Sequence, residues 1–529
     1  MTRRAFVAFS GGGAKGIVHV GALKALEERE LRFIGVSGTS AGAIVATLVA
    51  AGFRSNDLVN AEKRETIMTA LSNVDPTLKR VTDMFGRGGW PRVLLFRLAS
   101  RQSKLLWLAL FILWAGPIGI AFLLPKTAWI WIGLFWTAAA IGLFAFYRSL
   151  VGGLADIRRF RDALGRLLQT KMFPGETDRI VRMRDFGVEG RPPLKIVSAN
   201  LSRRTLQLFS AERTPDIPAA DAVAASVCLP VIFRPFEIGD DLYVDGGIVS
   251  NLPAWPFDEE RELDPDALTI AVEIESRPGH AKLSRFSWVS SAVPTALFGS
   301  GELNLRVAGP AEQLALPTKF ELLDFDKDLD SAIQEVNEVA VAAGIRLDKK
   351  LFRLPEIYRN ACQVAQVLAL DGLGLDPGGS GKSPRVRVAV GRLERGYTNS
   401  LRLSHSVGFE DDTDEMMLIP LEGSLAGVAW RDRQSHLETY PLAPDRDLPG
   451  DCNRLRRKAR WPNVKWMMCI PILNADDGTP RLLVQLDGNT KLPSNAETAT
   501  ALESVEEAVK DFFNLVLNEL KELEDDHGS

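Results

Sequence analysis

Residues 33–51 read FIGVSGTSAGAIVATLVAA, and this stretch decides the fold class. Phe33–Val36 is an apolar run that predicts a buried strand, and Ala43–Ala51 is apolar throughout and predicts a helix. Between them, residues 38–42 read GTSAG, which is GxSxG. A serine on a sharp strand-to-helix turn presents its hydroxyl at the start of a helix, whose dipole favours developing negative charge. Ser40 is therefore predicted to be a nucleophile, and an ordinary Gly/Ser turn is the alternative.

The same order of strand, loop and helix occurs once earlier in the chain. Ala5–Phe9 predicts a strand and Ile17–Leu26 a helix, with residues 10–16, SGGGAKG, between them. The N–H groups of this glycine loop can surround either an ester oxyanion or the pyrophosphate of a dinucleotide. A dinucleotide site needs an acidic residue about twenty positions later, where this chain has residues 37–40, SGTS. A P-loop needs Ser or Thr after Lys15, which glycine follows here, so the oxyanion is favoured.

Two further apolar runs predict additional strands of the same sheet. Leu194–Ser198 and Leu268–Ile274 are short and mainly apolar, which is typical of buried strands. Together with the two strand–loop–helix units, they predict an α/β sheet flanked by helices on both faces. We expect this domain to occupy residues 1–310.

Two long apolar runs interrupt this domain. Leu105–Leu124 and Thr127–Tyr147 enclose a single charge, Lys126, and each can cross about 30 Å of hydrocarbon as a helix. Basic residues flank both outer ends, so the positive-inside rule predicts that both ends are cytoplasmic. We therefore expect a transmembrane hairpin at residues 105–147, in an inner-membrane protein whose catalytic and C-terminal domains are cytoplasmic. A buried core hairpin is the alternative.

The second half of the chain has a different pattern. Asp326–Leu370 is rich in helix formers and precedes the turn-rich stretch Asp376–Pro384, so residues 311–384 are expected to be a helical connector and linker. Strand-like runs and a final amphipathic helix then predict a separate α+β domain at residues 385–529. The runs are residues 386–390, 416–420, 466–472 and 481–487, and the helix is Ala496–Leu523.

Composition excludes several classes of partner and cofactor. The formal net charge is −4, whereas proteins that neutralise nucleic-acid phosphates carry a clustered basic excess, so no nucleic-acid partner is expected. The four cysteines stand far apart without zinc-site spacing, so neither a metal nor another cofactor is expected, and a reducing compartment fits best. The N-terminus leads directly into the first strand, so no secretion signal is expected.

Residues 243–247, YVDGG, place Asp245 after an apolar run and before two glycines. On its own this pattern is typical of a turn. No histidine lies where it would obviously complete a triad with Ser40, and His19, beside the glycine loop, is expected to be a packing residue. A carboxylate would then have to act as the base.

Three patterns, GGGxKG at residues 11–16, GxSxG at 38–42 and DGG at 245–247, together resemble the patatin-like phospholipases. Residues 225–230, ASVCLP, and 248–253, IVSNLP, extend the resemblance, which covers about residues 4–275. It implies an α/β fold, a Ser/Asp dyad in place of a triad, and hydrolysis of lipid acyl esters through an acyl-enzyme.

The resemblance also implies roles for individual residues. Ser40 is expected to be the nucleophile, Asp245 its base, and the amides of Gly11, Gly12 and Gly13 the oxyanion hole. The other motif positions are expected to support the site: Lys15, Gly16, Gly38, Gly42, Gly246 and Gly247. The expected enzyme is a membrane-attached phospholipase A or lysophospholipase whose substrate is a membrane phospholipid or another acyl-ester lipid. The alternative is a non-catalytic, membrane-anchored sensor or scaffold with the same fold.

From about residue 355 to 525 the chain is similar to a GAF domain. The similarity is carried by residues 419–427, IPLEGSLAG, residues 469–472, CIPI, and residues 483–487, LVQLD. It implies a regulatory module that binds a small-molecule ligand or forms a homodimer. The acidic residues at 411–415 and the basic residues at 454–460 are expected to be solvated.

Overall fold

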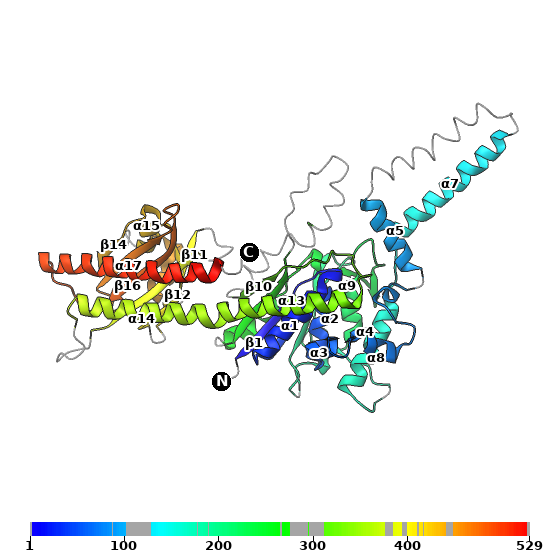
Figure 1. Cartoon of the computed structure of the whole chain (residues 1–529), viewed down its shortest axis with the longest axis horizontal. Coiled ribbons are helices and arrows are strands. Elements are labelled where there is room, and N and C mark those ends of the chain that lie inside the picture. The colour runs from blue at the N-terminus through cyan, green and yellow to red at the C-terminus, as the bar shows by residue number, and fades with distance from the viewer. Residues whose placement is uncertain are drawn as a thin grey trace. The chain divides into compact units, whose positions relative to one another are not determined.

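The computed structural model describes residues 3–529 except 87, 102–127, 177, 189, 265–266, 276–294, 296–310, 376–383, 394–398, 410–411, 416, 441–447 and 526–529. The chain forms two compact units, Met1–Leu347 and Asp348–Ser529. Each contains its own sheet, as Figure 1 shows. The two units are described separately below.

The first unit is built on an eight-stranded mixed sheet with the order β10-β9-β1-β2-β5-β8-β7, in which β6 also pairs with β5. Its five parallel strands include the four predicted ones and are β1 (Arg4–Phe9), β2 (Arg32–Thr39), β5 (Leu194–Asn200), β9 (Leu268–Ile274) and β10 (Glu312–Leu316). The antiparallel strands are β6 (Thr205–Phe209), β7 (Phe236–Ile238) and β8 (Asp241–Asp245). β1, β5 and β9 are buried along most of their length, and β2 is buried over its second half, in agreement with their mainly apolar sequences.

Strand β5 joins the two halves of this sheet. Its first half pairs in parallel with β2, so that Thr39 lies opposite Val197. Its second half pairs antiparallel with β8, so that Asp245 lies opposite Ser198, the next residue along β5. Strand β6 pairs with Ile196–Asn200, so β2 and β8 share the other edge of β5. The C-terminal ends of β2 and β8 therefore meet end to end.

Helices pack on the sheet and on one another. α2 (Ala41–Ala50) packs against β2 and α9 (Ala219–Val227), and nearly all residues of both helices are buried because small side chains allow close contact. α1 (Val18–Glu28) packs against α13 (Leu329–Leu347). The remaining helices are α3 (Ser55–Leu58), α4 (Ile67–Val74), α5 (Gly89–Arg101), α7 (Ala128–Val151), α8 (Arg158–Met172) and α10 (Asp258–Leu263), and a two-stranded ribbon is formed by β3 (Val59–Asn60) and β4 (Glu65–Thr66).

The predicted transmembrane hairpin is wrong. Among the helices formed by described residues, none combines the length and apolarity that a membrane span requires. A hairpin needs two such helices, but Leu105–Leu124 lies outside the described residues, and α7, which contains most of the second run, does not qualify. The predicted two-span inner-membrane localisation, which depended on the hairpin, is wrong with it. Exposed side chains on α7, such as Ile130 and Phe144, also argue against a buried core hairpin.

The second unit contains a six-stranded antiparallel sheet with the order β13-β12-β11-β16-β15-β14. The strands are β11 (Val386–Leu393), β12 (Ser400–Val407), β13 (Leu418–Pro420), β14 (His436–Thr439), β15 (Trp466–Leu473) and β16 (Pro480–Gly488). The helices are α14 (Leu354–Gly372), α15 (Leu425–Asp432), α16 (Arg454–Ala459) and α17 (Ala496–Asp525). The strand-like runs in the sequence correspond to β11, β13, β15 and β16, whereas β12 and β14 were missed. The domain limits at residues 310 and 384 remain predictions, and residues 376–383 of the linker lie outside the described residues.

Both faces of this second sheet are buried. Alternate residues of β15, such as Trp466 and Met468, pack with α14 and α17, while Met467 and Cys469 pack on the opposite face with residues of α15. This period of two is expected for a pleated strand between two cores. The sheet with its helices is an α+β arrangement.

A buried ionic cluster around Arg387 of β11 lies within the second unit. The Arg387 guanidinium is fully buried and donates hydrogen bonds of 2.6–2.9 Å to both oxygens of Asp487 and of Asp414. Its plane lies over the rings of Phe409 at 4.1 Å and Trp461 at 4.4 Å. The expectation that the acidic run is solvated is therefore wrong for Asp414, because its carboxylate pairs with a buried cation.

We expect Arg387→Ala to destabilise the second unit by about 3–5 kcal/mol, because it leaves two buried carboxylates without their cation. Hydrogen exchange of β11 and β16 peptides in the full chain measures this loss. The matched control is Arg392→Ala at the exposed end of the same strand, which should cost less than about 1 kcal/mol. Equal protection of β11 in the Arg387→Ala variant and the wild type would contradict the prediction that the ionic cluster stabilises the second unit.

Candidate active site

Ser40 occupies the turn between β2 and α2 in a strained backbone conformation. Its φ of 53° and ψ of −123° lie in a region that non-glycine residues rarely adopt. The small neighbours make this turn sterically feasible: a Cβ on Gly38 would lie 2.3 Å from the Gly42 carbonyl oxygen, and a Cβ on Gly42 would lie 2.2 Å from that of Phe9. These glycines support the turn without lining the cavity described below.

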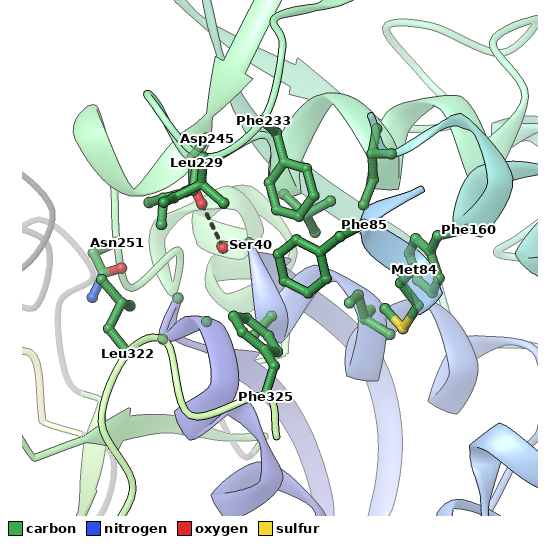
Figure 2. Close-up of a pocket in the computed structure, with 18 residues that line it drawn as sticks. Ser40, Met84, Phe85, Phe160, Leu229, Phe233, Asp245, Asn251, Leu322 and Phe325 are labelled. Atoms are coloured by element: carbon green, nitrogen blue, oxygen red, sulfur yellow. Dashed lines mark hydrogen bonds between the residues drawn. The ribbon is translucent and has the colours of Figure 1, made fainter. Parts of the chain in front are cut away.

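Asp245 meets Ser40 where β8 and β2 end. The Ser40 hydroxyl donates a hydrogen bond of 2.5 Å to Oδ2 of Asp245, as Figure 2 shows. Oδ1 of Asp245 accepts a 2.7 Å hydrogen bond from the Gly247 amide. A Cβ on Gly246 would lie 2.2 Å from the Val197 carbonyl oxygen, so this position needs glycine for β8 to approach β5. Two predicted site residues are thus in direct contact.

Ser226, at the C-terminal end of α9, connects the Ser40 turn to β5 by two hydrogen bonds. Its Oγ accepts a 2.9 Å hydrogen bond from the Ser40 amide and donates one of 2.6 Å to the Val197 carbonyl. The side chain is fully buried. Sequence reasoning included Ser226 only as part of a family pattern and missed this role. A buried serine in an alanine-rich helix carries no local signal of such a contact.

The glycine loop lines the same cavity as Ser40, and its three predicted oxyanion donors differ in availability. The Gly11 amide donates to the backbone carbonyl of Asn251 at 2.9 Å. Within the described part of the chain, the amides of Gly12 and Gly13 have no hydrogen-bond acceptor. Gly13 has a φ of 56°, which favours glycine. The geometry therefore leaves two of the three amides able to bind a ligand oxygen.

The other predicted positions of this loop lie beside the cavity. A Cβ on Gly16 would lie 2.6 Å from that of Ala41, so glycine lets the 3-10 helix Gly13–Ile17 approach α2. Lys15 is half-buried, and burial lowers the pKa of its ammonium group. Neither residue lines the cavity.

Burial also tunes the acid–base properties of Asp245. The carboxyl is 2% exposed, and desolvation raises its pKa to about 6, against the opposing hydrogen bonds from Ser40 and Gly247. A carboxylate with this pKa is a stronger base than an ordinary aspartate.

None of the histidines that the structure describes lines the cavity. His19 is fully buried, its Nε2 lies 2.7 Å from the Ser10 carbonyl oxygen, and burial lowers its pKa to about 4. This environment is that of a packing residue. His280 and His527 lie outside the described residues.

The walls of the cavity are mainly apolar. Phe85 is the central side chain: its ring stacks on that of Phe233 with centroids 5.1 Å apart and meets that of Phe325 edge-on at 5.0 Å. Figure 2 shows these rings beside the Ser40 hydroxyl. Other apolar lining residues are Ile44, Met84, Ile157, Phe160, Val227, Leu229, Ile232 and Leu322. Phe233 belongs to the family-like segment that follows residues 225–230, whereas Phe85 and Phe325 come from segments without a motif, so the sequence did not reveal those two.

These groups suffice for nucleophilic substitution at an ester. A hydroxyl contacts a buried base, two amides can bind a developing oxyanion, and an apolar space adjoins them. In the described ranges, no cluster of three or more His, Cys, Asp or Glu is arranged to hold a metal ion.

The raised pKa of Asp245 makes the protonated folded state favourable. Its contribution to stability is present below pH of about 4 and is lost as the pH rises through about 6, by up to about 3 kcal/mol. Asp245→Asn resembles the protonated form at every pH. We therefore expect the difference in unfolding free energy between this variant and the wild type to shift in favour of the variant when the pH is raised from about 4 to about 7.5. Denaturant unfolding at both pH values measures this gain. Asp240→Asn, at an exposed carboxylate of the β7–β8 turn, should show no such gain, and equal behaviour of both variants would contradict the burial argument.

Sequence comparisons relate this chain to known proteins. The family model "Patatin-like phospholipase" matches residues 7–258. The Bacillus subtilis protein YqhO is 26% identical over 280 residues, which cover 51% of this chain and 72% of that protein. The "Probable lipid hydrolase 463L" of Invertebrate iridescent virus 6 is 27% identical over 86 residues, which cover 16% of this chain and 30% of that protein.

Solved structures match each part of the chain with low global scores. VipD from Legionella pneumophila aligns with a TM-score of 0.31 and 18% identity, covering 66% of this chain and 67% of that one. The GAF domain of a sensor histidine kinase from Bacillus halodurans aligns with a TM-score of 0.20 and 16% identity, covering 30% of this chain and 96% of that one. The relation to a known family rests on the sequence match alone: residues 7–258 match the patatin-like phospholipase family.

Proposed function

We propose that the protein is a serine lipid acyl hydrolase that acts through the Ser40–Asp245 dyad and an acyl-enzyme. The observation that carries this proposal is the 2.5 Å hydrogen bond from the Ser40 hydroxyl to a buried carboxylate, at the wall of an apolar cavity. The family match and the lipid hydrolase relative support the same reaction class.

The first half of the reaction forms the acyl-enzyme. Asp245 accepts the hydroxyl proton while Ser40 Oγ attacks the ester carbonyl carbon, and the amides of Gly12 and Gly13 donate hydrogen bonds to the resulting oxyanion. The carbonyl re-forms as the bond to the leaving alkoxy oxygen breaks, and protonated Asp245 returns its proton to that oxygen. Ser40 is then esterified and the alcohol is free.

The second half releases the fatty acid. Asp245 takes a proton from water while the water oxygen attacks the acyl carbon of the ester on Ser40. Collapse of the second oxyanion breaks the bond to Oγ, which recovers its proton from Asp245. The backbone amides at the glycine loop are held in place before the reaction, so their alignment costs little at the transition state.

The shape and polarity of the cavity favour a lipid acyl group as substrate. Phe85, Phe233 and Phe325 offer apolar surface beside the nucleophile, and transfer of a methylene from water to such surface contributes about 0.8 kcal/mol. A phospholipid and a lysophospholipid both supply this acyl group. The regulatory role of the second unit and its GAF-like nature remain predictions.

We expect Ser40→Ala and Asp245→Asn each to reduce fatty-acid release from phospholipid vesicles by at least about a thousandfold, because each removes a member of the dyad. Released fatty acid is measured by mass spectrometry with the full chain. Ser72→Ala on α4, outside the cavity, should retain wild-type activity. Undiminished release by Ser40→Ala would refute the proposal.

We also expect kcat/KM to rise about tenfold between about pH 5 and pH 7, because Asp245 must be ionised to accept the serine proton and its pKa is about 6. A pH–rate profile on a soluble short-chain ester measures this rise without changing the lipid surface. A profile that stays flat across this range would exclude Asp245 as the base.

A further inference from the structure

One wall of the cavity comes from a segment that follows the family-matched residues 7–258. Residues 321–326, here called the 321–326 segment, lie between β10 and α13, and their side chains Leu322 and Phe325 line the cavity. We propose that Leu322 and Phe325 determine which acyl chains the site accepts, and that Arg97 of α5 is the positioning residue for this segment. The inference rests on the proposed function.

Leu322 lies directly against the glycine loop. Its backbone carbonyl accepts a 3.0 Å hydrogen bond from the amide of Ala14. A Cβ on Gly13 would lie 2.6 Å from that carbonyl oxygen and 2.9 Å from Cδ1 of Leu322. Figure 2 shows Leu322 on the side of the cavity that also holds Asn251. The segment therefore borders the proposed oxyanion donors without taking part in the dyad.

Phe325 completes the aromatic wall. Its ring meets Phe85 edge-on at 5.0 Å and Trp90 at 6.4 Å, and Phe85 in turn stacks on Phe233. Both ring neighbours of Phe325, Phe85 and Trp90, lie within the family-matched residues 7–258. Because the ring of Phe325 fills space next to theirs, its size limits the room available to an acyl chain.

Two sets of contacts hold the segment in place. The Arg97 guanidinium donates hydrogen bonds to Asp324 at 2.5 Å, to Asp326 at 3.0 Å and to the Leu323 carbonyl at 3.3 Å. The Arg97 and Asp324 side chains are only 15% and 5% exposed, so solvent screens this ion pair weakly. Upstream, buried Glu335 of α13 accepts hydrogen bonds from the Thr318 hydroxyl and the Lys319 amide.

This arrangement separates acyl-chain selection from chemistry. The dyad lies on the turn after β2 and at the end of β8, and the Gly12 and Gly13 amides lie on the glycine loop, whereas the 321–326 segment contributes only apolar side chains to the cavity. Side chains of the segment can therefore be substituted without altering the reacting groups. Displacing Arg97 should move Leu322 and Phe325 together, because three of its hydrogen bonds end on the residues between and after them.

A series of alkyl fluorophosphonates with short, medium and long chains tests the proposal on the full chain. Ser40 Oγ forms a bond to phosphorus, the phosphorus–fluorine bond breaks with loss of fluoride, and the serine proton passes to Asp245 and then to solvent. Intact-mass measurement of labelling rates gives the ratio of long-chain to short-chain reactivity. This ratio reports the shape of the acyl site and does not require turnover.

We expect Phe325→Ala to raise this ratio about tenfold, because the lost ring makes room for additional methylenes. Leu323→Ala, on the same segment but outside the cavity, is the matched control and should leave the ratio within about twofold of wild type. Arg97→Ala should shift the ratio in the same direction as Phe325→Ala, and Arg97→Lys should restore part of the wild-type ratio.

An unchanged ratio in both Phe325→Ala and Arg97→Ala, with labelling still present, would overturn the inference and leave the proposed function intact. Absence of Ser40 labelling in the wild type would instead overturn the proposed function and the inference with it. Phe325→Leu provides a milder change of volume if the alanine variant does not fold, and thermal unfolding identifies that case. A uniform loss of labelling at all chain lengths would indicate a purely structural role and would also overturn the inference.

Discussion

The end-to-end meeting of β2 and β8 on one edge of β5 is the constraint on which the site depends. One strand approaches in parallel and the other antiparallel, and their last residues lie opposite Val197 and Ser198. This pairing joins a hydroxyl and a carboxylate that are 205 positions apart in the sequence. Neither turn could bring the two side chains together by itself, because each turn fixes only the residues next to its own strand.

The same packing that brings the dyad together also gives it its properties. The turn at Ser40 tolerates a positive φ because Gly38 and Gly42 allow backbone atoms to approach closely. The Ser226 hydroxyl also supports this turn, because it accepts a hydrogen bond from the Ser40 amide. Burial of Asp245 costs stability near neutral pH, yet it raises the basicity of the carboxylate. A stability cost at a site is expected where function requires a desolvated charge.

The sequence predicted the local elements of the site well, but its prediction of a transmembrane hairpin was wrong. GxSxG, the glycine loop and DGG are each formed within a few residues, so their strand, turn and helix order could be predicted from spacing alone. The hairpin prediction was wrong because it relied on the hydropathy of two runs, and no helix formed by the described residues has the length and apolarity that a span requires. The acidic run was misjudged because its partner, Arg387, lies elsewhere in the sequence and is buried beside it only after folding.

By itself, the sequence singled out Ser40, Asp245 and the glycine loop as candidate site residues and determined the local turns that hold them, because backbone strain and glycine requirements act over a few neighbouring positions. Only the tertiary structure decided that Ser40 contacts Asp245, that Gly11 is already hydrogen-bonded, and that Leu322 and Phe325 close the cavity. These features depend on strand pairing and burial between distant segments. Pairing and burial are properties of the whole packed domain, and no short stretch of sequence encodes them.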